Sequence, residues 1–164
     1  MTRSSAKLAA LRMLAQRRLT QAQLTQRLYA RGYEAEEVRE AVDACKSTGY
    51  LNDELFARLF VEGRVKPVGD SRMVAELVRR GIDREAAVAS VADAEHGEEE
   101  RLEVALGKLF RTRPSINYPA AARALERLGF STAAIYRKLR EHAQSEALLG
   151  AASEERDLQT RMGA

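Results

Sequence analysis

The chain has 164 residues, of which 45% are hydrophobic, only 5% are aromatic and none is tryptophan. This length suits one domain or a short array of small modules. Alanine, leucine, arginine and glutamate are common and proline occurs only three times, which is typical of an all-helical protein with a core of small aliphatic side chains. A single cysteine, Cys45, excludes an intrachain disulfide and favours a reducing cytoplasm. The first residues lack a long apolar segment, so we expect neither a signal peptide nor a membrane span.

The net charge is +3, but it is unevenly distributed. Residues 1–50 carry nine basic and five acidic side chains, residues 95–100 carry four glutamates, and residues 101–140 carry nine basic and two acidic side chains. Alternating blocks of charge favour an anionic or mixed-charge partner over a uniform surface that wraps DNA.

Hydrophobic periodicity and capping residues predict nine helices. In chain order they cover residues 5–17, 21–31, 35–49, 53–64, 72–80, 84–94, 99–111, 119–128 and 132–143. We expect Leu8, Leu11 and either Leu14 or Ala15 to form the buried stripe of the first helix. Helical spacing likewise predicts that Phe56, Leu59 and Phe60 are core residues. Residues 144–164 are polar, alanine-rich and acidic, and are predicted to form a frayed helix or a disordered tail.

Three glycines that end predicted helices, Gly32, Gly81 and Gly129, mark an internal repeat. Each has a leucine four residues before it, a large apolar residue directly after it, and apolar residues six and ten positions later. These residues are Leu28, Tyr33, Val38 and Val42; Leu77, Ile82, Ala87 and Val91; and Leu125, Phe130, Ile135 and Leu139. We expect each glycine to turn the chain with positive φ while the apolar residue after it packs on the preceding helix, and we expect the same of Tyr50 after Gly49.

The predicted fold is therefore all-α, with three tandem three-helix repeats that resemble helix-turn-helix units and form an elongated, curved array. The predicted modules cover residues 5–49, 50–95 and 97–143, and the tail covers residues 144–164.

No catalytic constellation is evident in the sequence. His96, His142 and Cys45 have no partners at metal-ligand spacing, and we find no nucleophile elbow and no glycine-rich phosphate loop. We therefore predict a protein that is not an enzyme and that uses no metal and no cofactor.

Basic residues recur on the second helix of each module and around the break at residues 67–69. As a partner-binding surface we predict Arg31, Arg64, Lys66, Arg72, Arg79, Arg80, Arg123 and Arg127. For those beside Gly32 and Gly81, complementation of the helix dipole is an equally good explanation. A helix-turn-helix DNA reader needs cations on its third helix, and only residues 132–143 qualify. Candidate nucleic-acid contacts are Lys108, Arg111, Arg113, Arg137, Lys138 and Arg140.

Residues 49–82 resemble the RecX regulatory protein family. The resemblance lies in Gly49-Tyr50-Leu51-Asn52-Asp53, Phe56-Ala57, Val61, Arg64, Gly69, Arg72, Glu76-Leu77 and Arg80-Gly81-Ile82, and flanking segments extend it to roughly residues 8–140. It implies three tandem three-helix repeats without a catalytic site. It also implies binding in the groove of the RecA–single-stranded DNA filament, with inhibition of recombinase, ATPase and co-protease activities in homologous recombination, DNA repair and the SOS response.

Three hypotheses follow. The first is a monomeric regulator of the RecA filament that can also contact single-stranded DNA. The second is a direct DNA-binding protein that uses the basic segment 101–140, and the third is a helical scaffold for an unrelated protein. Affinity for bare DNA, falling steeply with salt, would distinguish the second from the first.

Overall fold

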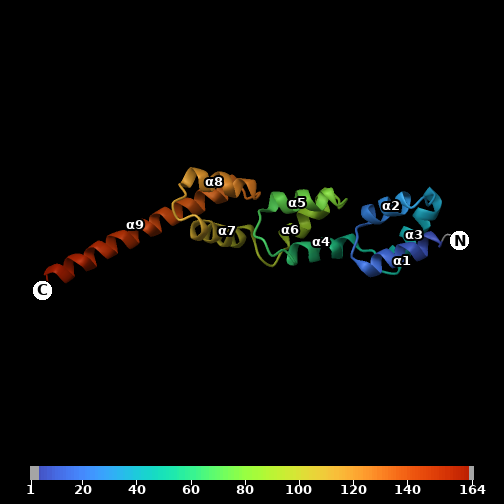
Figure 1. Ribbon diagram of the computed structural model, residues 1–164, viewed down its shortest axis with the longest axis horizontal. Coiled ribbons are helices and arrows are strands. Elements are labelled where there is room, and N and C mark those ends of the chain that lie inside the picture. Colours follow the sequence, from blue (N-terminus) through green and yellow to red (C-terminus); the bar gives the residue numbers. More distant parts are fainter. Residues whose placement is uncertain (1–3, 163–164) are drawn as a thin grey trace. The chain divides into compact units, whose positions relative to one another are not determined.

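The computed structural model describes the backbone of residues 4–162 and the side chains of residues 4–152. This part of the chain is all-α, without a strand (Figure 1). Its helices are α1 (Ala6–Gln16), α2 (Gln21–Ala30), α3 (Ala35–Ser47), α4 (Asp53–Glu62), α5 (Asp70–Arg79), α6 (Arg84–Ala92), α7 (Glu98–Thr112), α8 (Tyr118–Arg127) and α9 (Thr132–Met162). The all-α repeat prediction is thereby confirmed. The predicted ninth helix ended at residue 143, whereas α9 continues through the segment expected to fray.

The chain forms two compact units, one made of residues 1–66 and 70–97 and the other of residues 67–69 and 98–164. In the first unit α1, α2 and α3 pack on one another, and α6 packs on both α4 and α5. In the second unit α7, α8 and α9 pack on one another. The three predicted module boundaries and the curved form of the array stay predictions.

The three aligned glycines end their helices in the way the repeat predicts. Gly32, Gly81 and Gly129 have φ of 77°, 86° and 86°. In each turn the glycine N–H and the next N–H bond back to carbonyls three and five residues earlier. The bonds run from Gly32 to Tyr29, Tyr33 to Leu28, Gly81 to Val78, Ile82 to Leu77, Gly129 to Glu126 and Phe130 to Leu125. This pair of backbone hydrogen bonds is the Schellman motif. The apolar residue after each glycine is buried, as the repeat requires.

At Gly49 the prediction that the following residue, Tyr50, packs on the preceding helix was wrong. Gly49 also has positive φ, 75°, but Tyr50 after it is 67% exposed. Leu51 is buried instead, and its N–H bonds to the carbonyl of Cys45. One extra residue in this turn therefore moves the apolar contact to Leu51 and leaves the tyrosine ring in solvent.

The buried face of α1 also differs from the prediction. Ala6, Ala9, Ala10 and Met13 are buried, whereas Leu8 is 42% exposed and Leu11 and Leu14 are only partly buried. Short side chains let α1 approach α3 closely, because α3 also brings small residues to this core. The periodicity rule favours the larger side chains, and here close helix packing selects the alanines.

Two hydrogen bonds join the start of α2 to other helices of the first unit. Thr20 caps α2 through a capping box with Gln23, and its hydroxyl also donates to the carbonyl of Arg80, at 2.5 Å. The N–H of Gln21 donates to Asp53 Oδ1 at 2.8 Å. Thr20 is fully buried, so its hydroxyl needs a partner within the fold, and the two bonds link the start of α2 to the start of α4 and the end of α5.

The second unit has a separate core, built from leucine, alanine and Ile135 of α7, α8 and α9 and from Phe130 in the turn between α8 and α9. The short segment 67–69 lies against it: the N–H of Gly69 donates to the carbonyl of Leu128 at 2.9 Å, and Arg101 Nε donates to the carbonyl of Val68 at 3.1 Å. These bonds satisfy the backbone of a segment that a proline excludes from helix.

Candidate functional site

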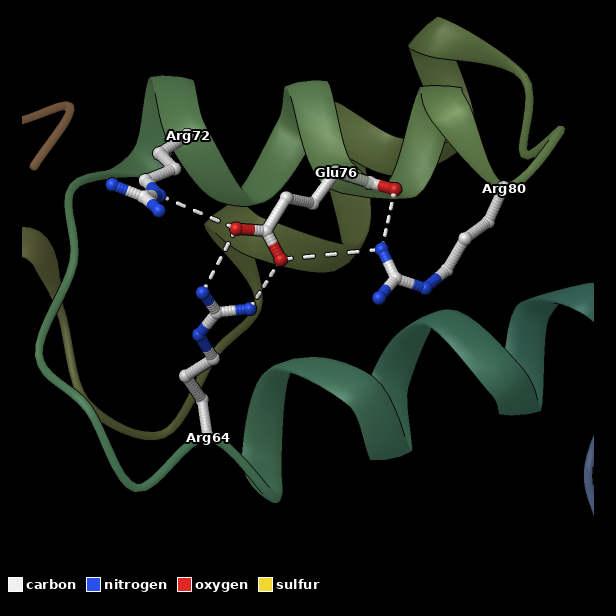
Figure 2. A network of polar contacts seen from close by, with 4 residues as sticks. All are labelled: Arg64, Arg72, Glu76 and Arg80. Carbon is white, nitrogen blue, oxygen red and sulfur yellow. Dashed lines mark hydrogen bonds and ion pairs between the residues drawn. The ribbon is translucent and has the colours of Figure 1, made fainter.

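The predicted basic surface around residues 64–80 is organised by a carboxylate that the prediction left out. Glu76 lies on α5 with Arg72 one turn before it and Arg80 one turn after it, so the three share a helix face. Arg64, which follows the end of α4 at Gly63, reaches the same carboxylate (Figure 2). We call Arg64, Arg72, Glu76 and Arg80 the Glu76 cluster.

Glu76 accepts a two-pronged ion pair from Arg64. The Nη1–Oε2 distance is 2.5 Å and the Nη2–Oε1 distance is 2.9 Å. Arg72 Nε lies 3.3 Å from Oε1, while Arg80 Nη1 lies 3.9 Å from Oε2 and donates to the backbone carbonyl of Glu76 at 2.8 Å. Paired donors of this kind fix the guanidinium plane as well as its position.

The environment keeps this carboxyl ionised. Glu76 is only 8% exposed, yet the hydrogen bonds from Arg64 lower its pKa from 4.5 to about 2, against the opposing effect of burial. The same hydrogen bond raises the pKa of Arg64. With three guanidiniums around one carboxylate, the Glu76 cluster keeps a formal charge of +2.

An aromatic ring lies beneath the cluster. Arg80 Cζ lies 4.5 Å and Arg64 Cζ 5.4 Å from the centroid of the Phe60 ring. Phe56, Leu59 and Phe60 are only half-buried, so their prediction as core residues was wrong. Instead, the guanidiniums of Arg64 and Arg80 lie over the face of the Phe60 ring, and this cation–π contact is favourable.

A shallow depression of about 430 Å³ adjoins the cluster. Phe60, Arg64, Val65 and Lys66 are among its lining residues, and Val65 is 94% exposed. Lys66 and Arg79 are exposed, and neither has an ion pair among the side chains of residues 4–152. Apolar groups and guanidiniums therefore share one surface, which is typical of sites that bind proteins.

The remaining predicted partner-binding residues lie elsewhere. Arg31 is the exposed C-cap residue of α2, and Arg123 and Arg127 are exposed on α8 of the second unit. None of them belongs to the Glu76 cluster. Of the eight residues predicted, the structure places Arg64, Arg72 and Arg80 around one carboxylate. In the sequence, Arg79 directly precedes Arg80 and Lys66 lies two residues after Arg64.

The candidate nucleic-acid contacts divide into two groups. Lys108, Arg111, Arg113 and Arg140 are exposed. Arg137 is ion-paired with Glu99, and Lys138 lies 3.2 Å from both Glu103 and Glu141. The hydrogen bond that Lys138 donates to Glu103 is the main cause of the raised pKa of Lys138. These two cations of α9 are thus held by acidic residues, which weakens the case for α9 as a DNA-reading helix.

Within residues 4–152 no group of histidine, cysteine and acidic side chains is arranged to hold a metal ion. Cys45 is buried, and burial raises the pKa of its thiol. His142 stacks on Phe110 with ring centroids 4.4 Å apart. Among the described helices, none is long and apolar enough to cross a membrane.

Sequence comparison identifies the repeat units. Residues 6–45 match the family model for the first three-helix domain of RecX, and residues 52–89 match the model for the second. The chain is 36% identical over 121 residues to the regulatory protein RecX of Thermus thermophilus, which covers 74% of this chain and 80% of that protein. The chain belongs to the RecX family.

Other RecX proteins agree with this assignment. The regulatory protein RecX of Syntrophotalea carbinolica is 30% identical over 152 residues, covering 85% of this chain and 97% of that protein. The match to the RecX of Caldanaerobacter subterraneus, 34% identical, spans only 50% of that longer protein. The crystal structure of RecX from Lactobacillus salivarius has a TM-score of 0.74 at 18% identity, covering 83% of this chain and 93% of that one, and so shares the fold.

Proposed function

We propose that this RecX-family protein binds the RecA filament on single-stranded DNA and inhibits its recombinase, ATPase and co-protease activities. In this proposal the protein acts in the cytoplasm as a monomer and has no catalytic site of its own. Membership of a family of regulatory proteins is the observation that carries the proposal. The Glu76 cluster is the surface that we assign to filament binding.

The geometry of the Glu76 cluster supports this assignment. Its guanidiniums are fixed by a shared carboxylate and by the Phe60 ring, so little side-chain entropy is lost when a partner carboxylate or phosphate is bound. The adjoining depression adds apolar area, and Arg79 and Lys66 add exposed positive charge. If each three-helix module of the protein contacts a successive subunit of the filament, the separate weak contacts add to the affinity through multivalency.

The test is the ATPase rate of RecA on single-stranded DNA, measured while the protein is titrated. We expect inhibition by the wild type, and weaker inhibition by a Lys66→Glu, Arg79→Glu double variant with unchanged helicity. Both residues lie outside the ion pairs of Glu76, so the reversal leaves the cluster intact. Arg12→Glu, which reverses an exposed cation of α1, is the matched control. Equal inhibition by the double variant and the wild type would contradict the proposed binding surface. No inhibition by the wild type would contradict the proposed function.

Direct DNA binding by the second unit is the rival function, favoured by the exposed cations Lys108, Arg111, Arg113 and Arg140. It requires affinity for bare DNA that falls steeply with salt. Binding to the filament with little affinity for bare DNA would rule it out. Failure to recover RecA with the protein from a cell extract would favour the third hypothesis, a helical scaffold.

A further inference from the structure

Tyr50 is an exposed aromatic residue that the fold does not use. Its neighbour Leu51 makes the apolar contact after Gly49, and the tyrosine ring is 67% exposed. No hydrogen bond of its hydroxyl is made within the described side chains. An exposed ring with no partner in the fold is available to stack on a ligand.

The ring borders a cleft of about 310 Å³ in the first unit. We call it the Tyr50 cleft; Leu14, Arg17, Arg18, Tyr50, Asn52 and Phe56 are the lining residues that matter here. Its volume is at the lower end of the range of about 300–1,000 Å³ for sites that bind small molecules. A single planar group with its attached charge fits a site of this size better than an extended protein surface does.

The charge of the Tyr50 cleft is wholly positive. Arg17 and Arg18 are exposed and make no ion pair with the described side chains, and none of the residues lining the cleft is acidic. Two acidic residues lie between the lining residues Asn52 and Leu55: Asp53 accepts from the N–H of Gln21, and Glu54 lines a different cleft. A second cleft of the same unit, between α4 and α6, has a net negative lining, because three acidic residues and one basic residue line it: Glu54, Glu62, Asp93 and Arg58. Of these two clefts, only the Tyr50 cleft therefore has a positively charged lining.

We propose that the Tyr50 cleft binds single-stranded nucleic acid directly, with a base stacked on Tyr50 and the neighbouring phosphates paired with Arg17 and Arg18. An aromatic platform beside a cationic groove is the arrangement by which proteins hold unpaired bases without reading their sequence. Phe56, half-buried in the wall, supplies apolar area beside the base. The inference goes beyond filament inhibition and does not depend on it, since the site is complete in the protein alone.

The test is fluorescence anisotropy of a labelled single-stranded oligothymidylate titrated with the full chain. Tyr50→Ala is expected to weaken binding about 5- to 150-fold, since stacking one base contributes about 1–3 kcal/mol. Tyr50→Phe keeps the ring and should bind like the wild type. Tyr29→Ala, which removes another half-exposed tyrosine of the same unit, is the matched control and should have no effect.

Salt dependence tests the two arginines separately. Replacing Arg17 and Arg18 with glutamine should reduce the slope of log K against log salt by about 1.4, because about 0.7 of a counterion is released for each phosphate neutralised on a single strand. The matched double variant Lys108→Gln, Arg111→Gln should leave the slope unchanged. Circular dichroism checks that every variant is folded.

Three results would overturn the proposal. Wild-type protein that does not bind oligothymidylate contradicts it, as does Tyr50→Ala binding with wild-type affinity. Loss of binding only in the Lys108→Gln, Arg111→Gln variant would assign the nucleic-acid contact to the second unit. If Tyr50→Ala impairs RecA inhibition while the wild type does not bind bare oligonucleotide, the cleft binds protein and not nucleic acid. The proposed inhibition of the filament would then stand, and this inference would not.

Discussion

The hydroxyl of Thr20 donates a hydrogen bond to the backbone carbonyl of Arg80, 60 residues further along the chain, at a distance of 2.5 Å. The same oxygen accepts from the N–H of Gln23 and so caps α2. Thr20 is fully buried, and the carbonyl it reaches directly precedes Gly81. One side chain therefore bonds to the end of α5 and caps the start of α2, and so links two consecutive repeats within the first unit.

Thr20→Val should destabilise the protein by about 2–4 kcal/mol. The change keeps the shape but leaves the Arg80 carbonyl without its donor, at a cost of about 1–3 kcal/mol, and also removes the cap, at a cost of about 1 kcal/mol. Urea unfolding of the full chain measures the loss. Thr20→Ser, which keeps the hydroxyl, is the control and should lose less than half as much. Equal loss in both variants would show that the methyl group, and not the hydroxyl, is responsible.

Gly81 and Gly49 offer a matched comparison of steric contact and backbone strain. Both have positive φ, but a Cβ at Gly81 would lie 2.2 Å from Cβ of Ala22, whereas a Cβ at Gly49 meets nothing within 4 Å. Gly49→Ala should cost about 1–2 kcal/mol from the left-handed conformation alone. Gly81→Ala should cost about 1–3 kcal/mol more, because the added methyl group is forced against α2.

The double variant Gly81→Ala, Ala22→Gly separates the two effects at Gly81. Removing the methyl group of Ala22 relieves the overlap, although a glycine in α2 costs up to about 1 kcal/mol by itself. In chemical denaturation we expect the two changes to be non-additive, with the double variant losing less than the sum of the single losses. Strict additivity would mean that α2 moves away from Gly81 without cost.

Protonation of Glu76 should make stability fall as the pH is lowered. Its pKa is about 2 in the folded protein, below the ordinary 4.5, so the unfolded chain binds the proton more tightly. The stabilisation is therefore fully present above about pH 4.5 and is lost as the pH falls from there towards about 2. The shift corresponds to about 3 kcal/mol.

Glu76→Gln tests this linkage. The variant should lose the pH dependence contributed by this one group, and at pH 7 it should be about 3–5 kcal/mol less stable because the guanidiniums lose their buried counter-charge. The free energy of unfolding measured between pH 3 and pH 7 gives both quantities. Glu36→Gln breaks the exposed pair with Arg39 and should change stability by less than about 1 kcal/mol. A wild-type pH profile in Glu76→Gln would assign the acid sensitivity to other carboxyls.

Local rules predicted the parts of this fold that depend on local geometry. A glycine at the end of a helix requires positive φ and an apolar residue after it, so the alignment of Gly32, Gly81 and Gly129 identified the turns and the buried leucine before each. The wrong face of α1 was chosen because periodicity alone does not indicate that α3 also brings small residues, and close approach then favours alanine over leucine.

The candidate site depended on contacts that spacing indicates only in part. Arg72, Glu76 and Arg80 are four residues apart, and this spacing could have predicted a shared carboxylate. Arg64 joins them only because α4 and α5 both pack on α6 within one unit, which no local pattern contains. Tyr50 was assigned to the turn because it follows Gly49, and only the three-dimensional structure shows that Leu51 occupies that place.

Arg79 and Arg80 are adjacent in the sequence but should respond differently to the same substitution. Arg80 lies over Phe60 and donates to the Glu76 carbonyl, whereas Arg79 is exposed and lies outside the cluster. Arg80→Gln should therefore lower the free energy of unfolding by about 1–3 kcal/mol through the lost stacking and hydrogen bond. Arg79→Gln should change it by less than about 0.5 kcal/mol, as exposed substitutions do.

Thermal unfolding and RecA inhibition, measured side by side, separate the roles of these two arginines. If the proposed surface is correct, Arg79→Gln weakens inhibition without a change in melting temperature, which identifies a contact with the partner. Reduced inhibition by Arg80→Gln would be ambiguous unless corrected for the unfolded fraction, so that variant is compared at a temperature well below its transition. A lower melting temperature for Arg79→Gln than for Arg80→Gln would contradict the arrangement of the Glu76 cluster.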